Sequence, residues 1–385
     1  MQKVKLGLIG LGNIGSSHLK CIQEGKTPEI ELAAVADVRL DRRQAAADLL
    51  GEGVRLFETG SELIASGTCE AVLIAVPHYQ HPVLAMESFA NGLHVLCEKP
   101  AGVYTSQVRE MNGAARKSGL TFAMMFNQRT NCVYRKMREL VQDGALGALK
   151  RVNWIITDWY RTQYYYDTGA WRATWDGEGG GVLLNQCPHN LDLLQWICGM
   201  PQRVQAFCHN GKWHDIEVED DVTAYLEYPN GATGVFVTTT ADAPGTNRFE
   251  LTGECGKLVC ENDTLTFHRL AMNEREFCRT AQSGFDKPAC EVIQVETNGE
   301  NPQHAGVMNS FAANILRGEP LVADGEEGIH GLMLSNAMHL SSWLRQSVDL
   351  PVDEALFLAK LNELRANSRR KTAVTETISD TAGSY

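Results

Sequence analysis

The sequence lacks the features that mark membrane, secreted and zinc-ribbon proteins. No apolar run approaches the roughly 20 residues of a membrane-spanning helix, and Met1-Gln2-Lys3 leads directly into an expected core strand, without a signal peptide. The eleven cysteines are odd in number and include no C-x-x-C pair, which argues against a disulfide scaffold and a zinc ribbon. We therefore expect a cytoplasmic protein with free thiols, no bound metal and no membrane partner.

Basic residues are scarce relative to acidic ones. Lys and Arg number 35 against 47 Asp and Glu, which gives a formal net charge of −12 over 385 residues. Binding to a nucleic-acid backbone needs clustered basic side chains, so we expect no nucleic-acid partner. The hydrophobic fraction of 44% and the charged fraction of 21% are ordinary for a soluble globular protein, and the length suits two domains.

Short apolar segments alternate with amphipathic ones through the first third of the chain. Strands are expected at 4–9, 30–36, 54–57, 71–76, 94–97 and 121–126, and helices at 14–23, 41–50, 81–90 and 106–117. Strands that alternate with helices at this spacing predict a parallel, doubly wound sheet. The fold class expected for residues 1–126 is therefore an α/β domain of the Rossmann type.

The pattern changes after about residue 127. Runs of longer strands joined by turns, between 149 and 268, indicate a large mixed or antiparallel sheet. Helices are expected at 132–142, 182–198, 304–316 and 328–345. We therefore predict a second α/β domain over residues 127–365, for substrate binding and oligomerisation, and a loose tail over 366–385, most of which lacks apolar periodicity.

A glycine motif joins the first expected strand to the first helix. Gly10-Leu11-Gly12-Asn13-Ile14-Gly15 is G-x-G-x-x-G. Gly10 allows a tight turn, Gly12 leaves room for a pyrophosphate, and Gly15 permits close packing of helix and strand. The N–H groups of Asn13, Ile14 and their neighbours would face the phosphates. A tight turn without a ligand is the alternative, and the flanking strand and helix argue against it.

Asp37 ends the second expected strand, 22 residues after Gly15. Its carboxylate can accept hydrogen bonds from the ribose hydroxyls of NAD and would repel the 2′-phosphate of NADP. Arg39, together with Arg42 and Arg43, could instead accommodate that phosphate. NAD is therefore the expected cofactor, with NADP as the alternative.

Two further segments hold candidate catalytic residues. Glu98-Lys99-Pro100 follows the fifth strand, at the sheet edge where ligands bind, and the Lys99 ammonium could stabilise a developing alkoxide. Taken alone, a solvated Glu–Lys pair is the commoner explanation of this tripeptide. Asn185, His189 and Asp192 are spaced to share one face of the expected helix 182–198. His189 could accept a proton, although a core histidine explains it equally well.

Together these motifs resemble the Gfo/Idh/MocA (glucose–fructose oxidoreductase, inositol dehydrogenase, rhizopine catabolism) family of oxidoreductases. The resemblance covers about residues 3–350 and rests on the glycine motif, Ala75-Val76-Pro77-His78, Glu98-Lys99-Pro100 and the segment from Gly179-Gly180-Gly181 to Pro188-His189. It implies that His189 is the catalytic base, that Lys99 holds the substrate oxygen, and that the protein forms a homodimer or homotetramer. The residues that it implies beside the nicotinamide end of the cofactor are Pro77, His78, His81, Glu98 and Lys99.

Asn185 departs from the commonest family pattern, which has Asp at this position. An amide cannot ionise, so it offers His189 no anionic partner, and the imidazole should be less basic than usual. Some sugar 3-dehydrogenases of the family resemble this Asn version, which favours oxidation at a sugar C3. Asn185 is therefore a third candidate catalytic residue, able only to orient or to hydrogen-bond.

An aromatic and charged segment precedes the glycine run. Eight Trp and Tyr residues lie between Trp154 and Trp175, interleaved with Arg and Asp. Flat aromatic faces can cover the C–H faces of a pyranose ring while charged groups bond its hydroxyls, although core packing is the alternative. The candidate substrate-binding residues are Lys99, Asn127, Arg161, Tyr165, Trp171, Arg172, Asn185 and His189.

The sequence thus predicts an NAD(H)-dependent dehydrogenase or ketoreductase that exchanges a hydride with a secondary alcohol of a sugar, glycoside or cyclitol. A second hypothesis is a redox-neutral glycosidase that oxidises C3, eliminates the aglycone and then re-reduces the sugar. A third is a non-catalytic NAD-binding regulator, for which Lys99 and His189 would have no catalytic use.

Overall fold

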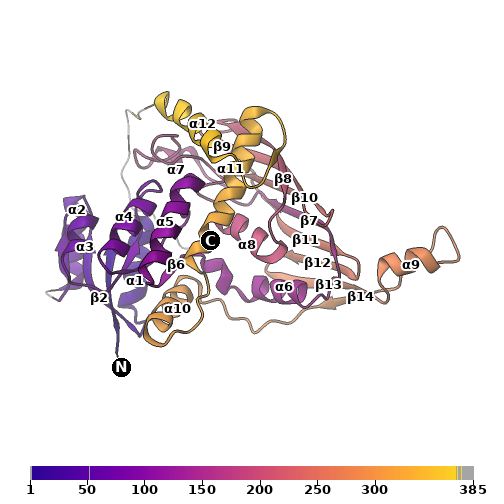
Figure 1. Ribbon diagram of the computed structural model, residues 1–385, viewed down its shortest axis with the longest axis horizontal. Coiled ribbons are helices and arrows are strands. Elements are labelled where there is room, and N and C mark those ends of the chain that lie inside the picture. The colour runs from indigo at the N-terminus through magenta and orange to yellow at the C-terminus, as the bar shows by residue number, and fades with distance from the viewer. Residues whose placement is uncertain (1, 52, 370, 372–373, 375–385) are drawn as a thin grey trace.

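The computed structural model describes residues 2–51, 53–369, 371 and 374, which form two sheets with helices around them (Figure 1). The N-terminal elements are β1 (Val4–Ile9), α1 (Asn13–Gln23), β2 (Ile30–Ala36), α2 (Leu40–Leu50), β3 (Arg55–Phe57), α3 (Gly60–Ala65), β4 (Ala71–Ile74), α4 (Gln80–Ala90), β5 (His94–Cys97), α5 (Thr105–Ser118) and β6 (Phe122–Met124). The six strands are parallel, in the order β3-β2-β1-β4-β5-β6. The predicted doubly wound Rossmann sheet is therefore confirmed.

The strands of this sheet are apolar because helices cover both of its faces. Leu6 and Leu8 of β1 and Leu73 of β4 are completely buried. The carboxyl ends of the parallel strands meet at one edge, where a doubly wound fold binds its ligands. The glycine motif, Asp37, Pro77 and Glu98 follow β1, β2, β4 and β5, so the topology gathers the sequence motifs there.

The C-terminal part is built on a nine-stranded sheet. Its elements are η1 (Asn127–Thr130), α6 (Cys132–Gln142), β7 (Leu149–Ile156), α7 (Gln163–Asp167), α8 (Pro188–Cys198), β8 (Arg203–Asn210), β9 (Glu219–Glu227), β10 (Thr233–Thr239), β11 (Asn247–Gly253), β12 (Gly256–Glu261), β13 (Thr264–Leu270), α9 (Glu274–Thr280), β14 (Cys290–Gln294), α10 (Gln303–Arg317), η2 (Gly325–Glu327), α11 (Gly328–Leu344), β15 (Val348–Asp349) and α12 (Glu354–Ala366). The strand order is β14-β13-β12-β11-β7-β10-β9-β8-β15. Because β7 and β10 pair in parallel and the other neighbours are antiparallel, the sheet is mixed, one of the two predicted forms.

Helices cover one face of the large sheet. Along β7, Val152, Trp154 and Ile156 are buried, whereas Arg151 and Ile155 on the opposite face are exposed. α11 packs on β8 and on α8, and α6 packs on α8 and β13. Figure 1 shows α8 and α11 between this sheet and the Rossmann helices. α8 is thereby held close to the edge where the sequence motifs gather.

α10 returns from the C-terminal part to the first sheet. Its Val307, Met308 and Phe311 share an apolar core with Leu6 and Leu8 of β1, and the helix packs on β1 and β5. This helix crosses the division expected at residue 126, because residues of the second part complete the core of the first. The domain boundaries themselves stay a prediction.

The helix predicted over 182–198 begins only at Pro188. Proline is favoured in a first helical turn because its missing N–H would have no partner there. Before it, the buried Glu219 carboxylate accepts hydrogen bonds from the N–H groups of Gly181, at 2.8 Å, and Leu183, at 3.0 Å, which holds this backbone in turns. The prediction was therefore wrong for 182–187, and Asn185 does not share a helix with His189.

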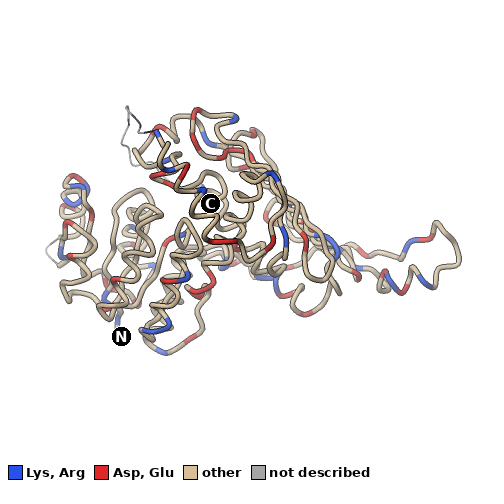
Figure 2. Tube along the Cα trace, turned by 45° about the horizontal axis from the view of Figure 1, so that its top comes forward, with Lys and Arg blue, Asp and Glu red and all other residues tan. Residues whose placement is uncertain are grey.

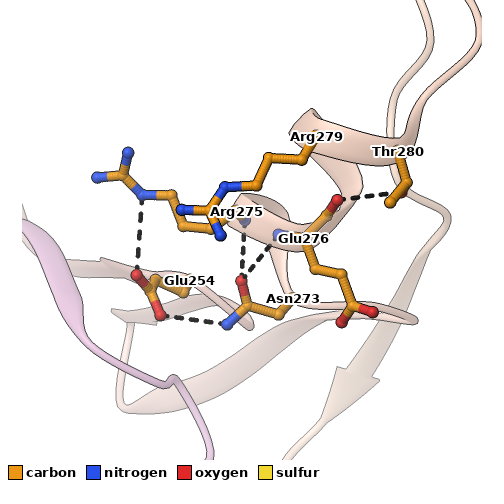
Figure 3. Close-up of a pocket in the computed structure, with 6 residues that line it drawn as sticks. All are labelled: Glu254, Asn273, Arg275, Glu276, Arg279 and Thr280. Carbon is orange, nitrogen blue, oxygen red and sulfur yellow. Dashed lines mark hydrogen bonds and ion pairs between the residues drawn. The ribbon is translucent and has the colours of Figure 1, made fainter.

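α9 projects from the body of the molecule (Figure 1) and was not predicted. Figure 3 shows a surface hollow beside it, lined by Glu254, Asn273, Arg275, Glu276, Arg279 and Thr280. Asn273 Oδ1 caps the helix by accepting from the Arg275 N–H at 2.8 Å, and its Nδ2 donates to Glu254 at 3.1 Å. These polar groups satisfy one another, and the hollow lies far from the motifs at the Rossmann edge (Figure 1).

Acidic and basic residues are interspersed along both parts of the molecule (Figure 2). All eleven cysteines fall in the described part and are free thiols. Over the described residues, no helix has the length and apolar character to cross a membrane, and no three His, Cys, Asp or Glu side chains are grouped as metal ligands. Of the predicted tail, residues 370, 372–373 and 375–385 lie outside the described part.

Candidate active site

The glycine motif forms the turn between β1 and α1. Gly10 has a φ of +97°, and an added Cβ would lie 2.3 Å from the Ala75 carbonyl oxygen. A Cβ on Gly15 would lie 2.0 Å from the Gly10 carbonyl oxygen, whereas one on Gly12 would meet only the Arg42 guanidinium, at 3.8 Å. The fold therefore requires glycine at positions 10 and 15, while Gly12 leaves open space beside the first turn of α1.

Asn13 and Ile14 are the first two residues of α1. Gly12 is the N-cap, and no side-chain cap hydrogen bond is formed there within the described residues. The first N–H groups of a helix have no partner inside it and carry the positive end of its dipole. The open space at Gly12 is therefore bordered by groups that favour an anion.

Asp37 lies buried beside this turn. Its Oδ2 accepts a hydrogen bond from the Leu11 N–H at 2.7 Å and lies 3.5 Å from Arg42. Its Oδ1 accepts from the Arg39 N–H at 2.8 Å, and the Arg39 side chain pairs with Asp41 at 2.6 Å. The structure thus brings Asp37 next to the glycine motif, and Oδ1 can accept a further hydrogen bond.

His81, in the helix after Pro77, has both ring nitrogens at hydrogen-bonding distance from backbone carbonyl oxygens. Nδ1 lies 2.7 Å from the Pro100 carbonyl oxygen and Nε2 lies 2.7 Å from that of Val76. Burial lowers the pKa of this imidazole. His81 therefore ties the loop after β4 to the loop after β5, which leaves neither ring nitrogen for a ligand.

Glu98 follows β5 and contacts a histidine that sequence analysis missed. His18 Nε2, from α1, lies 2.6 Å from Glu98 Oε1, and the His304 ring packs edge-on against His18 at 5.2 Å. Burial opposes ionisation of Glu98, but the His18 hydrogen bond and the surrounding cationic groups outweigh it and lower the pKa to about 2. Burial and then His18 lower the pKa of His304 to about 4. Glu98 is therefore an ionised carboxylate held at the base of the loop.

Lys99 is half-buried and reaches across to the second part of the molecule. Its Nζ donates a 2.9 Å hydrogen bond to the Asn185 backbone carbonyl oxygen. Its backbone N–H donates to Glu98 Oε2 at 3.1 Å. Burial lowers the pKa of Lys99, and the nearby Glu98 charge opposes this.

His189 lies in the first turn of α8 and is buried. Among the described residues, neither of its ring nitrogens has a hydrogen-bond partner. The ring packs edge-on against Phe126, with centroids 6.3 Å apart. Burial, followed by the charge of Lys99, holds the pKa of His189 well below its ordinary value. The imidazole is therefore neutral at neutral pH, and it lies within electrostatic reach of the Lys99 ammonium.

Asp192, one turn along α8, does not partner His189. Its carboxylate accepts hydrogen bonds from Arg129 Nη2 at 2.6 Å and Nε at 2.8 Å. Arg129 also pairs with Glu327 and lies over the Trp196 ring, 5.2 Å from its centroid. Asp192 therefore anchors α8 to η1, and the expected shared face of Asn185, His189 and Asp192 does not form.

Asn185 precedes α8, and its side chain has a carboxylate partner that sequence analysis missed. Its Nδ2 donates to Oε1 of Glu178, a buried carboxylate whose pKa is raised by that burial. The Glu178 carbonyl oxygen lies 3.1 Å from Nδ1 of His78, whose ring packs against Trp171 at 5.3 Å. The available signal was an acidic residue enclosed by glycines, Gly177-Glu178-Gly179, directly before the glycine run.

Part of the aromatic segment gathers around Tyr165. Arg172 Nη1 donates to the Tyr165 hydroxyl at 2.7 Å, and its guanidinium lies 4.6 Å from that ring centroid and 4.8 Å from that of Trp171. Arg161 also lies over the Tyr165 ring, 5.3 Å from its centroid. Both guanidinium charges reinforce the lowering of the Lys99 pKa by burial, so they lie within electrostatic reach of Lys99.

The other aromatic residues of the segment have ordinary structural positions. Trp154, Tyr166 and Trp175 are buried in the core, whereas Tyr160 and Tyr164 are exposed. Core packing, the alternative interpretation of this segment, therefore explains Trp154, Tyr166 and Trp175.

Asn127 follows β6 and is fully buried. Its Nδ2 donates to Gln303 Oε1 at 2.5 Å, while its Oδ1 has no hydrogen-bond partner within the part of the chain that the structure describes. Asn127 thus joins the end of the first sheet to the start of α10, next to His304.

Two family models match the chain. The oxidoreductase family with an NAD-binding Rossmann fold matches residues 4–126, and the GFO/IDH/MocA C-terminal domain matches residues 134–259. Between them they cover both sheets' central strands, so the match includes the two parts that meet at Lys99 and Asn185.

Curated relatives include dehydrogenases that align over most of their length. The D-glucoside 3-dehydrogenase of Escherichia coli is 25% identical over 382 residues, covering 90% of this chain and 97% of that protein. The myo-inositol 2-dehydrogenase of Thermotoga maritima is 24% identical, covering 90% and 98%. The rhizopine catabolism protein MocA of Rhizobium meliloti is 29% identical over 199 residues, and that alignment spans 52% of this chain and 58% of MocA.

Solved structures share the whole fold. The WlbA dehydrogenase from Bordetella pertussis, in complex with NADH and UDP-GlcNAcA, superposes with a TM-score of 0.78 at 26% identity. The superposition covers 92% of this chain and 99% of WlbA.

Proposed function

This chain belongs to the Gfo/Idh/MocA family of NAD-binding oxidoreductases, and we propose that it transfers a hydride between a secondary alcohol of a sugar, glycoside or cyclitol and NAD. For a sugar, C3 is the favoured position. One observation carries the proposal: the Lys99 ammonium, from the carboxyl edge of the Rossmann sheet, bonds the Asn185 carbonyl oxygen four residues before His189, and its charge contributes to the lowered pKa of that imidazole. Within the described residues, both His189 nitrogens lack partners, as a base awaiting a substrate proton requires.

The residues at the β1–α1 turn fit NAD. A side chain at position 12 would occupy the open space beside the N-terminus of α1, and Asp37 offers a carboxylate at the position that suits ribose hydroxyls. The Asp37 charge disfavours a 2′-phosphate. Arg39 and Arg42 lie next to Asp37 and could pair with such a phosphate, so NADP is tested beside NAD. When bound, NAD supplies a nicotinamide ring that takes up or releases the hydride.

His189 and Lys99 divide the proton and charge chemistry between them. Because burial and the Lys99 charge keep it neutral, His189 can take the hydroxyl proton as the alcohol carbon loses its hydride. The Lys99 ammonium stabilises the negative charge that develops on the alcohol oxygen. Glu98 holds the Lys99 backbone in place. In ketone reduction, His189 returns the proton to the same oxygen.

The Tyr165 cluster supports a carbohydrate as the substrate. Arg161 and Arg172 stack on aromatic rings, and in the described residues neither forms an ion pair with a carboxylate. Arg172 Nη1 donates to the Tyr165 hydroxyl and Arg161 Nη1 to the Tyr160 carbonyl oxygen, and the other guanidinium N–H groups can serve substrate hydroxyls. The names of the glucoside and inositol dehydrogenases among the relatives support the same class of substrate.

We also propose that the protein acts as a homodimer or homotetramer in the cytoplasm. On the uncovered face of the large sheet, Ile155, Phe207 and Tyr225 are exposed, and contiguous apolar surface favours association. Light scattering with size-exclusion chromatography would give the mass in solution, and a monomer would contradict the oligomer.

A panel of sugars, glycosides and inositols with NAD and with NADP tests the activity. Oxidation of at least one member should produce the absorbance of reduced nicotinamide. Chromatography of each reaction would detect released aglycone without net NADH, which the redox-neutral glycosidase predicts. Silence of the whole panel with both cofactors, and with the corresponding ketones and NADH, would contradict the proposed function.

A further inference from the structure

Glu178 is a buried carboxylate to which the mechanism above gives no role. Its Oε1 accepts a hydrogen bond from Asn185 Nδ2, and its Oε2 accepts one from the Ala173 N–H. Its carbonyl oxygen contacts His78 Nδ1 at 3.1 Å. Burial lowers the pKa of Lys99 and the Glu178 charge opposes this, so the carboxylate lies within electrostatic reach of the reactive ammonium.

Glycines on both sides hold the Glu178 backbone in place. A Cβ on Gly177 would lie 2.4 Å from the Trp171 carbonyl oxygen, and one on Gly179, whose φ is +83°, would lie 2.3 Å from Val103 Cγ1. Only glycine allows such close approach at these two positions. The Glu178 carboxylate is therefore placed by tightly packed backbone rather than by a free loop.

This contact determines which end of the Asn185 carboxamide faces Glu178. An ionised carboxylate can only accept hydrogen bonds, so it selects the Nδ2 end of the amide. In the part of the chain that the structure describes, no donor reaches Asn185 Oδ1. The backbone carbonyl oxygen of the same residue accepts from Lys99 Nζ. Asn185 thus combines a bond to the reactive ammonium with an unused side-chain acceptor.

We propose that Glu178 is a positioning residue that holds the Asn185 carboxamide so that Oδ1 accepts a hydrogen bond from a second hydroxyl of the substrate. This inference rests on the proposed dehydrogenation, in which His189 takes the proton of the reacting hydroxyl. Because Asn185 is bonded to Lys99, which holds the reacting oxygen, the second hydroxyl lies on a neighbouring carbon. The preferred substrates are therefore vicinal diols within sugars or cyclitols.

Exchanging the amide and the carboxylate tests the pair. In Glu178→Gln, a neutral amide can bond either end of Asn185, so kcat/KM for the panel sugar that the wild type oxidises fastest is expected to fall about tenfold or more. Asn185→Asp places two carboxylates at one contact and is also expected to lose activity. The double variant E178Q/N185D restores an amide-to-carboxylate hydrogen bond and is expected to exceed both single variants.

Glu217→Gln is the matched control. Glu217 Oε2 accepts a 3.3 Å hydrogen bond from the N–H of Trp175, which lies in the loop that also holds Glu178, and Glu217 does not contact Asn185. The kcat/KM of Glu217→Gln is therefore expected to stay within twofold of the wild-type value. NADH affinity should also stay within twofold in all four variants. With an analogue of the same sugar that lacks the neighbouring hydroxyl, Glu178→Gln and the wild type are expected to be equally slow.

A measurement without substrate separates this inference from the proposed function. In protein labelled with ¹⁵N at asparagine, the Asn185 side-chain resonances are expected to shift as Glu178 titrates, and Glu178→Gln should abolish that shift. The titratable and charged groups that act on or around Glu178 are His78, Lys99, Tyr166, Arg172, Glu219 and Lys371, and they remain in the variant.

Three results would overturn the inference: Glu178→Gln within twofold of the wild type in kcat/KM, a double variant no better than the product of the single effects, or Asn185 resonances that do not respond to Glu178. A wild type that oxidises no panel member would instead overturn the proposed function, and the resonances would still decide whether Glu178 orients Asn185.

Discussion

The Lys99 ammonium donates a 2.9 Å hydrogen bond to the backbone carbonyl oxygen of Asn185, 86 positions further along the chain. This bond joins the loop after β5 of the Rossmann sheet to the turn before α8, which carries His189. Lys99 therefore belongs to the Rossmann part of the molecule, while the C-terminal part orients its side chain.

Gly12 and Gly15 are expected to respond differently to the same substitution. Gly12→Ala meets only the Arg42 guanidinium at 3.8 Å, so the fold should be unchanged while NADH affinity falls about tenfold or more. Gly15→Ala places a Cβ 2.0 Å from the Gly10 carbonyl oxygen and should lose about 1–3 kcal/mol of unfolding free energy or more. NADH fluorescence titration and urea denaturation measure the two effects. Equal losses of stability in both variants would contradict this assignment.

Asp37 is expected to set the preference for NAD over NADP. Asp37→Ser removes the carboxylate that would bond ribose hydroxyls and repel a 2′-phosphate, so the ratio of the NAD and NADP affinities should fall by about 10- to 100-fold. Asp48→Ser, at an exposed position of α2, the helix that follows Asp37, is the control. Titration of each protein with NADH and NADPH gives the ratio, which would stay constant if Asp37 had only a structural role.

Arg129 is expected to stabilise α8 by neutralising Asp192. Both side chains of this ion pair are about 1% exposed, and Arg129→Met would leave the carboxylate buried without its partner. The expected loss is about 3–5 kcal/mol of unfolding free energy, measured by urea denaturation. Arg129→Met with Asp192→Leu should recover much of it, because no buried charge then remains. A double variant as unstable as the single one would show that packing, not charge, holds this helix.

Acidification is expected to destabilise the protein partly through His304. Its pKa is lowered by burial to about 4 in the folded protein, from an ordinary value of 6.5. Between these values the unfolded chain binds a proton that the folded chain does not, so the unfolding free energy falls as the pH falls. His304→Gln should flatten this dependence by up to roughly 1.4 kcal/mol per pH unit. An unchanged slope between pH 6.5 and 4 would contradict the shift.

Local patterns were sufficient to predict the elements that the Rossmann edge needs. The helix expected at 132–142 coincides with α6, and the strand expected at 30–36 coincides with β2, because apolar periodicity and flanking turn residues are encoded within each segment. The glycine motif was equally informative, since the backbone requires glycine at positions 10 and 15 and Gly12 leaves the open space beside α1.

Contacts between distant segments could not be predicted in this way. His18 lies within the predicted first helix, but its role depends on Glu98, 80 positions away. The start of α8 was misplaced because the carboxylate of Glu219 holds the Gly181 and Leu183 N–H groups outside a helix. Glu178 was missed for the same reason, since its partners Asn185 and Ala173 meet it only in the folded loop.

The catalytic roles of His189 and Lys99 can be measured directly in single variants. With the panel substrate that the wild type oxidises fastest, His189→Ala and Lys99→Met are each expected to lower kcat by about 10²- to 10⁴-fold, while NADH affinity stays within twofold. His330→Ala, at a half-buried position on α11, should leave kcat unchanged. Loss of kcat in both variants would establish these roles, and a His189→Ala protein that keeps kcat within threefold of the wild type would contradict the role of His189 as the base.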